Sequence, residues 1–185
     1  MEESTQFMYE IDNVCVTGGA GFIGSHLVER LVREGHNVVV LDDLSSGSLD
    51  NLASVMSDIA FVEGSVTNQD VVRSVLRDVD TVFHLASRVS VPESFSEPKL
   101  YSEVIVDGAK NVGSSAGTRI IQASSCSVYG DPTEIPTSEN CPAFPSSPYA
   151  FCKYLAETFS DTSLRFFNVF GPRQSHDSPY SGIIA

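Results

Sequence analysis

Hydrophobic and polar positions along the chain follow two alternating patterns. Short runs of consecutive apolar, mostly β-branched residues predict buried strands, and stretches with apolar residues every three or four positions predict helices. The predicted strands are residues 13–17, 38–41, 59–62, 81–85, 119–123 and 163–167. The predicted helices are residues 22–34, 69–76, 99–112 and 149–159. Apolar strands that alternate with helices are typical of an α/β fold, in which a doubly wound parallel sheet carries helices on both faces.

Residues 131–148 break this alternation. They contain five prolines and are predicted to form a long loop. A loop of this length in a compact domain is usually functional or disordered. Its last residue, Pro148, favours the start of the helix that follows.

A glycine-rich turn joins the first predicted strand to the first predicted helix. Gly18, Gly21 and Gly24 form the pattern G-x-x-G-x-x-G. Glycine here permits a tight turn, lets a diphosphate touch bare backbone and lets the helix pack closely on the strand. The free N–H groups and partial positive charge at the helix N-terminus then attract the phosphates. Because a strand precedes this turn and a helix follows it, the pattern predicts a Rossmann-type dinucleotide-binding fold.

The second predicted strand ends at an acidic residue, Asp42, 18 residues after Gly24. A carboxylate in that place accepts hydrogen bonds from the adenosine ribose and repels a 2′-phosphate, which favours NAD over NADP as the cofactor. The alternative is a plain tight turn followed by a solvated pair, Asp42 and Asp43.

A phenol and an ammonium group, those of Tyr149 and Lys153, are spaced four residues apart on one face of a predicted helix. A nearby lysine favours the phenolate and lowers the tyrosine pKa, so Tyr149 can accept a proton from a sugar hydroxyl. Ser125 follows the fifth strand, at the carboxyl edge where open α/β sheets bind ligands, and can share that proton. The spacing alone is weak support, because many helices carry a surface tyrosine and lysine four apart.

Composition excludes several classes of partner. The chain has 185 residues and a formal net charge of -13, which disfavours nucleic acid and anionic lipid surfaces. No apolar run approaches the ~18 residues of a membrane span, and the acidic start, Met1–Ser4, lacks the basic residues of a signal peptide. Four cysteines without a C-x-x-C pair argue against a zinc site or a disulfide scaffold. We therefore expect a cytoplasmic protein without a metal.

Several motifs together resemble the extended short-chain dehydrogenase/reductases, and among them the NAD-dependent epimerase/dehydratase family, close to its UDP-glucose 4-epimerase-like members. They occur in the family's order and cover nearly the whole chain. The matching stretches are residues 17–24, 41–47, 83–87, 123–130, 148–153 and 164–173.

The resemblance assigns roles to individual residues. Ser125, Tyr149 and Lys153 match the catalytic serine, base and lysine, and Asn168 matches a contact to the diphosphate of the substrate; Ser125 and Tyr149 also face the sugar. The lysine and tyrosine also hold the nicotinamide ribose. The remaining matches to cofactor-binding positions are Gly18, Gly21, Phe22, Ile23, Gly24, Asp42, Val66, Leu85, Ala86 and Ser87.

The resemblance also implies a reaction and partners. In this family bound NAD takes a hydride from C4 of a nucleotide sugar, and an epimerase returns it to the opposite face. A UDP-hexose is the expected substrate. Relatives often dimerise through the helices that match residues 99–112 and 149–159, which suggests a homodimer, but the shortened segments here would weaken that pairing and the oligomeric state stays open. Dehydratases of the family carry an Asp-Glu pair just after the catalytic serine, where this chain has Cys126 and Ser127.

Some features depart from the family pattern. Ser65 replaces an aspartate near the adenine, and Ile105 replaces an asparagine that approaches the cofactor. The helix after Gly108 and the segment after Lys153 are short. Residues 1–170 are expected to form the NAD-binding domain, and residues 171–185 the start of a truncated substrate-binding region. A catalytically weak or silent NAD-binding paralogue therefore remains an alternative, as does a dehydratase or reductase.

Two further residues, Arg173 and His84, could be taken for site residues. Arg173 either binds a diphosphate or is an ordinary loop arginine. His84, at a strand end, is expected to pack in the core.

Overall fold

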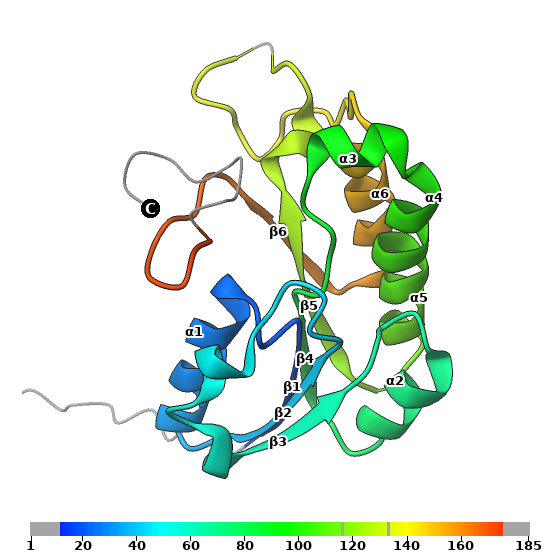
Figure 1. Ribbon diagram of the computed structural model, residues 1–185. Coiled ribbons are helices and arrows are strands. Elements are labelled where there is room, and N and C mark those ends of the chain that lie inside the picture. Colours follow the sequence, from blue (N-terminus) through cyan, green and yellow to red (C-terminus); the bar gives the residue numbers. More distant parts are fainter. Residues whose placement is uncertain (1–11, 116, 133, 176–185) are drawn as a thin grey trace, which may run out of the picture.

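A single parallel sheet organises the chain. The computed structural model describes residues 12–115, 117–132 and 134–175. Six strands pair side by side in the order β3-β2-β1-β4-β5-β6, all of them parallel (Figure 1). Their bounds are β1 (Asn13–Thr17), β2 (Asn37–Asp42), β3 (Ile59–Glu63), β4 (Thr81–His84), β5 (Arg119–Ser125) and β6 (Thr162–Phe166). The predicted strands and the parallel α/β sheet are confirmed.

Helices cover both faces of this sheet, which confirms the doubly wound, Rossmann-type architecture. Helix α1 (Phe22–Arg33) lies on one face, and α2, α5 and α6 lie on the other (Figure 1). The other α-helices are α2 (Gln69–Val75), α3 (Val91–Ser96), α4 (Pro98–Tyr101), α5 (Gly108–Gly113) and α6 (Pro148–Ala156). Short helical turns are η1 (Leu49–Leu52), η2 (Met56–Asp58), η3 (Ser102–Asp107), η4 (Cys126–Tyr129) and η5 (Glu157–Phe159).

The core reflects the two-faced burial of the central strands. In β1, Val14 and Val16 pack in the cluster under α1, whereas Cys15 between them packs in the cluster under α2 and α5. Successive strand residues point to opposite faces, so a strand that is buried on both faces is apolar at every position. This is why the sequence shows continuous apolar runs.

The predicted helix over residues 99–112 is interrupted in the structure. Its middle turn, η3, is a π-helix between the α-helical segments α4 and α5. Ile105 lies in that turn, is 2% exposed and packs in a third cluster with Tyr101 and Tyr149. Helical periodicity in sequence does not distinguish an α-turn from a π-turn, so this difference was not predicted.

The proline-rich segment forms the predicted loop, with no helix or strand in its described residues between η4 and α6. The backbone N–H of Phe144 donates to the carbonyl oxygen of Val128 over 2.9 Å, which returns the loop to η4. A side chain at Gly130, where φ is +63°, would meet the carbonyl oxygen of Phe144. The loop is therefore anchored close to the end of β5.

Within the described part of the chain, none of the helices has the length and apolar character needed to cross a bilayer.

Candidate active site

The strand order changes direction between β1 and β4. The chain first runs from β1 outward to β2 and β3, and then crosses to β4 on the other side of β1. In open α/β sheets, ligands bind in the crevice beyond the carboxyl ends of the strands at such a switch point. The glycine turn follows β1 at this crevice, and Leu85 to Ser87 follow β4.

The glycine turn leaves no room for a side chain at Gly18 or at Gly24. Gly18 has φ +71°, and a Cβ there would lie 2.7 Å from the backbone nitrogen of Ala86. A Cβ at Gly24 would lie against the carbonyl oxygen of Gly18 and 2.8 Å from Cα of Gly19. Gly21 precedes the first residue of α1, Phe22, so the first N–H groups of the helix open into this space. A bare backbone cradle at a helix N-terminus fits a diphosphate.

The carboxylate of Asp42 is held against the glycine turn. Its Oδ2 accepts a hydrogen bond from the N–H of Ala20 over 2.9 Å, and its Oδ1 accepts from the N–H of Leu44 over 2.8 Å. Burial raises the pKa of Asp42, and these two backbone bonds oppose the rise. Each carboxylate oxygen keeps a second lone pair, so the fixed group can still accept from ribose hydroxyls.

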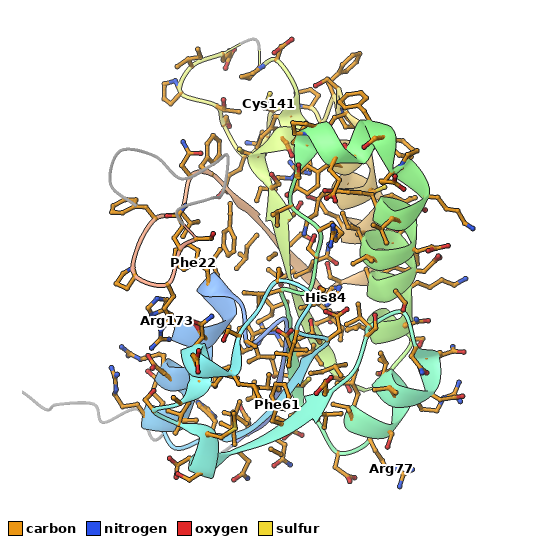
Figure 2. The ribbon with its side chains drawn as sticks, viewed as in Figure 1. Phe22, Phe61, Arg77, His84, Cys141 and Arg173 are labelled. Atoms are coloured by element: carbon orange, nitrogen blue, oxygen red, sulfur yellow. The ribbon has the colours of Figure 1, made fainter. Side chains whose placement is uncertain are left out.

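A buried hydrogen-bond network joins the glycine turn to the end of β4. Thr17 Oγ1 lies 2.7 Å from Nδ1 of His84 and accepts from the N–H of Ala86 over 3.3 Å. Burial, with a smaller contribution from the charge of Lys153, lowers the pKa of His84 to about 3, so the ring is neutral. Figure 2 labels His84 in the interior of the molecule, and its 3% exposure confirms the predicted packing role. The network fixes two sides of the crevice relative to each other.

Predicted adenine-side residues follow β3. Val66 is 4% exposed, and its carbonyl oxygen accepts a hydrogen bond of 2.9 Å from the side-chain amide of Asn111. Ser65, in place of an acidic residue, accepts from the N–H of Thr67 over 3.3 Å. This local turn gives Ser65 a structural partner within its own segment.

Tyr149 and Lys153 come from the first two turns of α6. Pro148 begins this helix, and the hydroxyl of Ser147 caps it by accepting from the N–H of Ala150 over 3.1 Å. Tyr149 is 8% exposed, with its ring edge-to-face against Tyr101 at 6.3 Å between centroids. The predicted pair is thus held by the packing of α6 on α4.

The ammonium group of Lys153 reaches the sheet. Its Nζ donates a hydrogen bond of 2.8 Å to the carbonyl oxygen of Ala123, two residues before Ser125. Lys153 is 6% exposed, and burial lowers its pKa to about 8. The structure therefore brings the lysine to the end of the strand that carries the predicted catalytic serine.

Ser125 ends β5 and caps the short turn η4. Its Oγ accepts from the backbone N–H of Ser127 over 3.2 Å and is 2.8 Å from the hydroxyl of Ser127. A hydroxyl that accepts these bonds is fixed in position while its own proton stays available for a ligand oxygen.

The remaining predicted residues lie nearer the rim. Ser87 donates its hydroxyl to the carbonyl oxygen of Arg88 over 2.8 Å. Asn168 is exposed, two residues beyond β6. The side chain of Arg173, which Figure 2 labels, pairs with Glu29 on α1 at 2.5 Å, and the carbonyl oxygen of Pro172 accepts from His26. Whether Arg173 binds a diphosphate or is an ordinary loop arginine stays a prediction. Of the predicted substrate-binding segment 171–185, residues 176–185 lie outside the described residues.

Three structural features around the site were not predicted from sequence: the hydrogen bonds of Thr17, the partner of Lys153 and the contacts of the acidic residue Glu157, one helical turn after Lys153. The spacing of Tyr149, Lys153 and Glu157, each four residues apart, was the available signal, because such residues share one helix face. In the described residues, no group of three His, Cys, Asp or Glu side chains is arranged to hold a metal ion.

Comparisons with known proteins agree with this geometry. A family model described as the NAD dependent epimerase/dehydratase family matches residues 14–185. UDP-glucose 4-epimerase of Mycolicibacterium smegmatis is 37% identical over 188 residues, which cover 92% of this chain and 60% of that protein.

Two solved structures are similar over most of the chain. UDP-N-acetylglucosamine 4-epimerase from Methanobrevibacter ruminantium M1, in complex with UDP-N-acetylmuramic acid, is 36% identical with a TM-score of 0.87, over 95% of this chain and 61% of that one. UDP-glucose 4-epimerase from Brucella ovis, in complex with NAD, is 33% identical with a TM-score of 0.74, over 80% of this chain and 46% of that one. The chain thus spans about half to three fifths of the length of these relatives.

Proposed function

Because the chain belongs to the NAD-dependent epimerase/dehydratase family, we propose that it takes part in the epimerisation of a nucleotide sugar, with UDP-glucose and UDP-galactose as the first candidates. NAD is the cofactor of this family, in agreement with the glycine turn and Asp42. The observation that carries the proposal is the placement of Lys153 on the carbonyl oxygen of Ala123, beside Ser125 and one helical turn from Tyr149.

The proposed roles follow from these contacts. When bound, NAD supplies the hydride acceptor and donor for the sugar C4. The phenolate of Tyr149 accepts the proton of the C4 hydroxyl, and Ser125 binds the same oxygen. Lys153, whose pKa is lowered to about 8 by burial, still carries its charge at pH 7 and stabilises that phenolate.

Cofactor binding is assigned to the two sides of the crevice. The backbone of Gly18 to Gly24, including Phe22 and Ile23, would hold the diphosphate, and Asp42 would accept from the adenosine ribose. Val66 would contact the adenine, and Leu85 to Ser87 would line the nicotinamide side. Lys153 and Tyr149 would hold the nicotinamide ribose, and Asn168 would contact the diphosphate of the sugar nucleotide.

The domain division and the assembly are also proposals. Residues 1–170 would form the NAD-binding domain and residues 171–185 the start of the substrate-binding region. A homodimer through α6 is supported by its exposed apolar side chains, Phe151 at 57%, Tyr154 at 44% and Leu155 at 39% exposure. A cytoplasmic location is part of the same proposal, supported by four cysteines that lie far apart in the sequence without a C-x-x-C pair.

A second candidate is an NAD-binding module without turnover. The observation that favours it is the buried Ile105 at the position where an asparagine is expected, because its side chain neither donates nor accepts a hydrogen bond. Dehydration is disfavoured by Cys126 and Ser127, which stand in place of the acidic pair of the dehydratases.

The test combines NAD titration with an assay of UDP-glucose and UDP-galactose interconversion. The Tyr149→Phe variant is expected to lose at least about 100-fold in rate, as for removal of a general acid–base group. Tyr154→Phe on the same helix is the matched control: it removes only the hydroxyl, keeps the aromatic ring that the proposed dimer contact uses, and keeps the rate. Interconversion unchanged in Tyr149→Phe would remove the mechanism. NAD binding without product from any nucleotide sugar in a panel would favour the silent module.

A further inference from the structure

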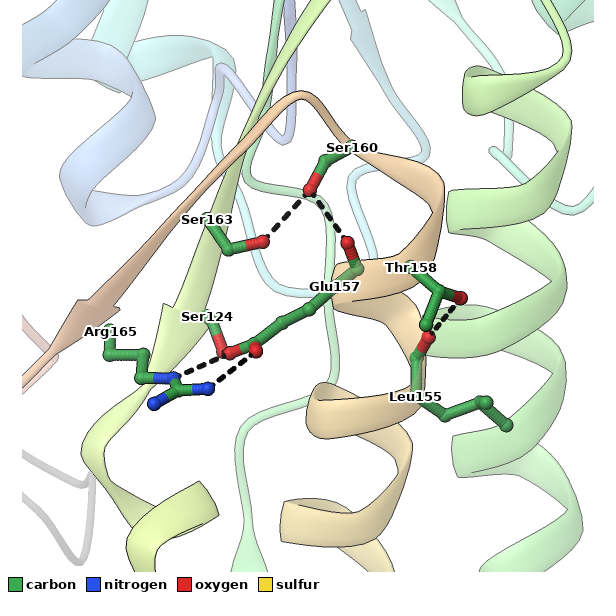
Figure 3. Close-up of polar contacts among 7 residues, drawn as sticks. All are labelled: Ser124, Leu155, Glu157, Thr158, Ser160, Ser163 and Arg165. Atoms are coloured by element: carbon green, nitrogen blue, oxygen red, sulfur yellow. Dashed lines mark hydrogen bonds and ion pairs between the residues drawn. The ribbon is translucent and has the colours of Figure 1, made fainter. Parts of the chain in front are cut away.

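A partly buried ion pair binds Ser124, the residue before the predicted catalytic serine. Glu157, the residue after α6, accepts two hydrogen bonds from Arg165 on β6, at 2.9 Å from Nε and 2.8 Å from Nη2 (Figure 3). The hydroxyl of Ser124 donates to the same carboxylate over 2.6 Å. We call these three residues, Ser124, Glu157 and Arg165, the carboxylate anchor.

The carboxylate anchor connects both sides of the catalytic centre. Lys153 lies on α6, and Glu157 follows one turn later, directly after the helix. They bind two successive residues of β5: Lys153 the carbonyl oxygen of Ala123, and Glu157 the side chain of Ser124. The next residue of the strand is Ser125. Two hydrogen bonds therefore link the end of the helix that carries Tyr149 to the strand end that carries Ser125.

Arg165 extends the anchor beyond Ser125. Its guanidinium carbon lies 4.7 Å from the ring centroid of Tyr129, at the end of the turn η4 that Ser125 caps. In the sheet, Arg165 is also the register partner of Ser124. The anchor thus holds the residue before Ser125 and the last residue of the turn after it.

The two charged groups of the anchor, the carboxylate of Glu157 and the guanidinium of Arg165, form an ion pair. Burial by itself raises the pKa of Glu157, but the hydrogen bonds from Arg165 and Ser124 outweigh it and lower the pKa below its ordinary value. The side chains of Arg165 and Glu157 are 22% and 14% exposed. A buried pair of this kind seldom adds net stability over apolar residues of the same volume, so stability alone is a weak reason for it.

We propose that the carboxylate anchor is a positioning device, in which Ser124 fixes Ser125 in register with Tyr149 for proton transfer. The catalytic role of the carboxylate anchor rests on the proposed function. Its effect on the position of Ser125 is a structural claim that does not depend on that function. Neither Ser124 nor Glu157 touches the substrate in this account. They act through Ser125 and through the end of β5.

The neighbouring hydroxyl pair provides a matched control. Ser163, also on β6, lies 2.8 Å from the hydroxyl of Ser160 in the same region (Figure 3). Ser163→Ala removes one hydroxyl hydrogen bond close to the anchor without touching Ser124. Ser124→Thr keeps the hydroxyl on a strand, where β-branched residues are well accommodated.

The decisive experiment measures amide hydrogen exchange by NMR. The N–H of Ser127 depends on Ser125 as its acceptor, and the N–H of Gly130 on Ser127. In Ser124→Ala, both are expected to exchange about tenfold faster, the effect of one lost hydrogen bond, while the N–H of Val72 in α2 keeps its rate. Ser124→Thr restores the wild-type rates, and Ser163→Ala leaves them unchanged. Unchanged rates in Ser124→Ala, or an equal rise at Val72, would overturn the proposal.

Steady-state kinetics distinguish a positioning role from a general structural role, because only a positioning role lowers kcat while KM and NAD binding stay unchanged. Ser124→Ala is expected to lower kcat about tenfold, with KM and the Kd for NAD within about twofold of wild type. A loss carried by KM or by NAD binding instead would overturn the positioning role. If the wild-type chain itself has no turnover, the proposed function fails, and the exchange rates still decide whether the anchor fixes Ser125.

Discussion

The Nζ of Lys153 lies 2.8 Å from the carbonyl oxygen of Ala123, and this contact buries an ammonium group under the end of the sheet. Burial lowers the lysine pKa to about 8, so the folded protein releases this proton more readily than the unfolded chain does. The buried charge of Lys153 therefore destabilises the folded protein. Such a cost is expected when a charged side chain serves to bind a ligand.

Replacing this lysine is expected to stabilise the protein without ligand. At pH 7, Lys153→Met should raise the free energy of unfolding by about 1–3 kcal/mol, because removing the buried charge stabilises the protein by more than the lost hydrogen bond to Ala123 costs. Between pH 8 and pH 10, the unfolded chain binds more protons at Lys153 than the folded one, so wild-type stability rises with pH and the difference shrinks. Urea unfolding at several pH values measures this.

Lys110→Met, at an exposed position of α5, is the control and should leave the stability nearly unchanged. A Lys153→Met variant less stable than wild type at pH 7 would show that burial is not the dominant effect on this residue.

The carboxylate of Asp42 should determine the choice between the two nicotinamide dinucleotides. Asp42→Asn removes the negative charge that repels a 2′-phosphate and weakens the acceptor for the ribose hydroxyls. We expect the ratio of NAD to NADP affinity to fall by about tenfold. Calorimetric titration with both dinucleotides measures it.

The neighbouring Asp43 supplies the control, since its carboxylate is exposed and accepts from the N–H of Ser45 over 3.0 Å. Asp43→Asn should keep the wild-type ratio. An equal change in both variants would indicate a general charge effect instead of a contact of Asp42.

The hydroxyl of Thr17 joins the two sides of the crevice. Thr17→Val leaves the buried ring nitrogen of His84 and the N–H of Ala86 without this partner, so the free energy of unfolding should fall by about 1–3 kcal/mol. Because Ala86 lines the crevice, the affinity for NAD should fall as well. Chemical denaturation and NAD titration measure the two effects.

Thr118→Val removes a comparable bond, the 3.1 Å contact from its hydroxyl to the carbonyl oxygen of Val79. This control should lower stability but keep the NAD affinity of the wild type. If Thr17→Val binds NAD as tightly as Thr118→Val does, the network does not shape the site.

The buried His84 should make the protein sensitive to acid. Burial lowers the pKa of His84 to about 3. As the pH is lowered from 6.5 toward 3, the unfolded chain therefore binds a proton that the folded chain does not, and the free energy of unfolding decreases. In His84→Gln, the loss of stability from pH 7 to pH 4.5 should be smaller than in wild type by about 2 kcal/mol. Urea unfolding at the two pH values gives the difference.

His36→Gln, at a less buried position, is the reference for this comparison. The same reduction in both variants would mean that the acid sensitivity does not come from His84.

The sequence predicted those parts of the fold that depend on local patterns. The apolar run of β1, the glycines that follow it and the start of α1 at Phe22 are consecutive, and each restricts the backbone of its own segment. Asp42 was predictable for the same reason, because its place at the end of β2 is set by the strand.

Contacts between distant segments were not predictable in this way. Thr17 and His84 are 67 residues apart, and their hydrogen bond exists only because β1 and β4 are neighbours in the sheet. The contact of Glu157 with Arg165 similarly depends on how α6 leads into β6. The π-helical turn at Ile105 was missed because an α-turn and a π-turn have the same apolar pattern in sequence.

The central claim is that NAD lies across the carboxyl edge of the sheet, with its nicotinamide ring against Tyr149 and its adenosine beside Asp42. At 19.9 kDa, the protein is suited to NMR. Nuclear Overhauser effects between bound NAD and the protein test the claim directly. The account predicts contacts from the nicotinamide protons to the ring of Tyr149, and from the adenosine protons to Val66. Contacts from the nicotinamide to the amino edge of the sheet, near Asn13 and Val75, would contradict it.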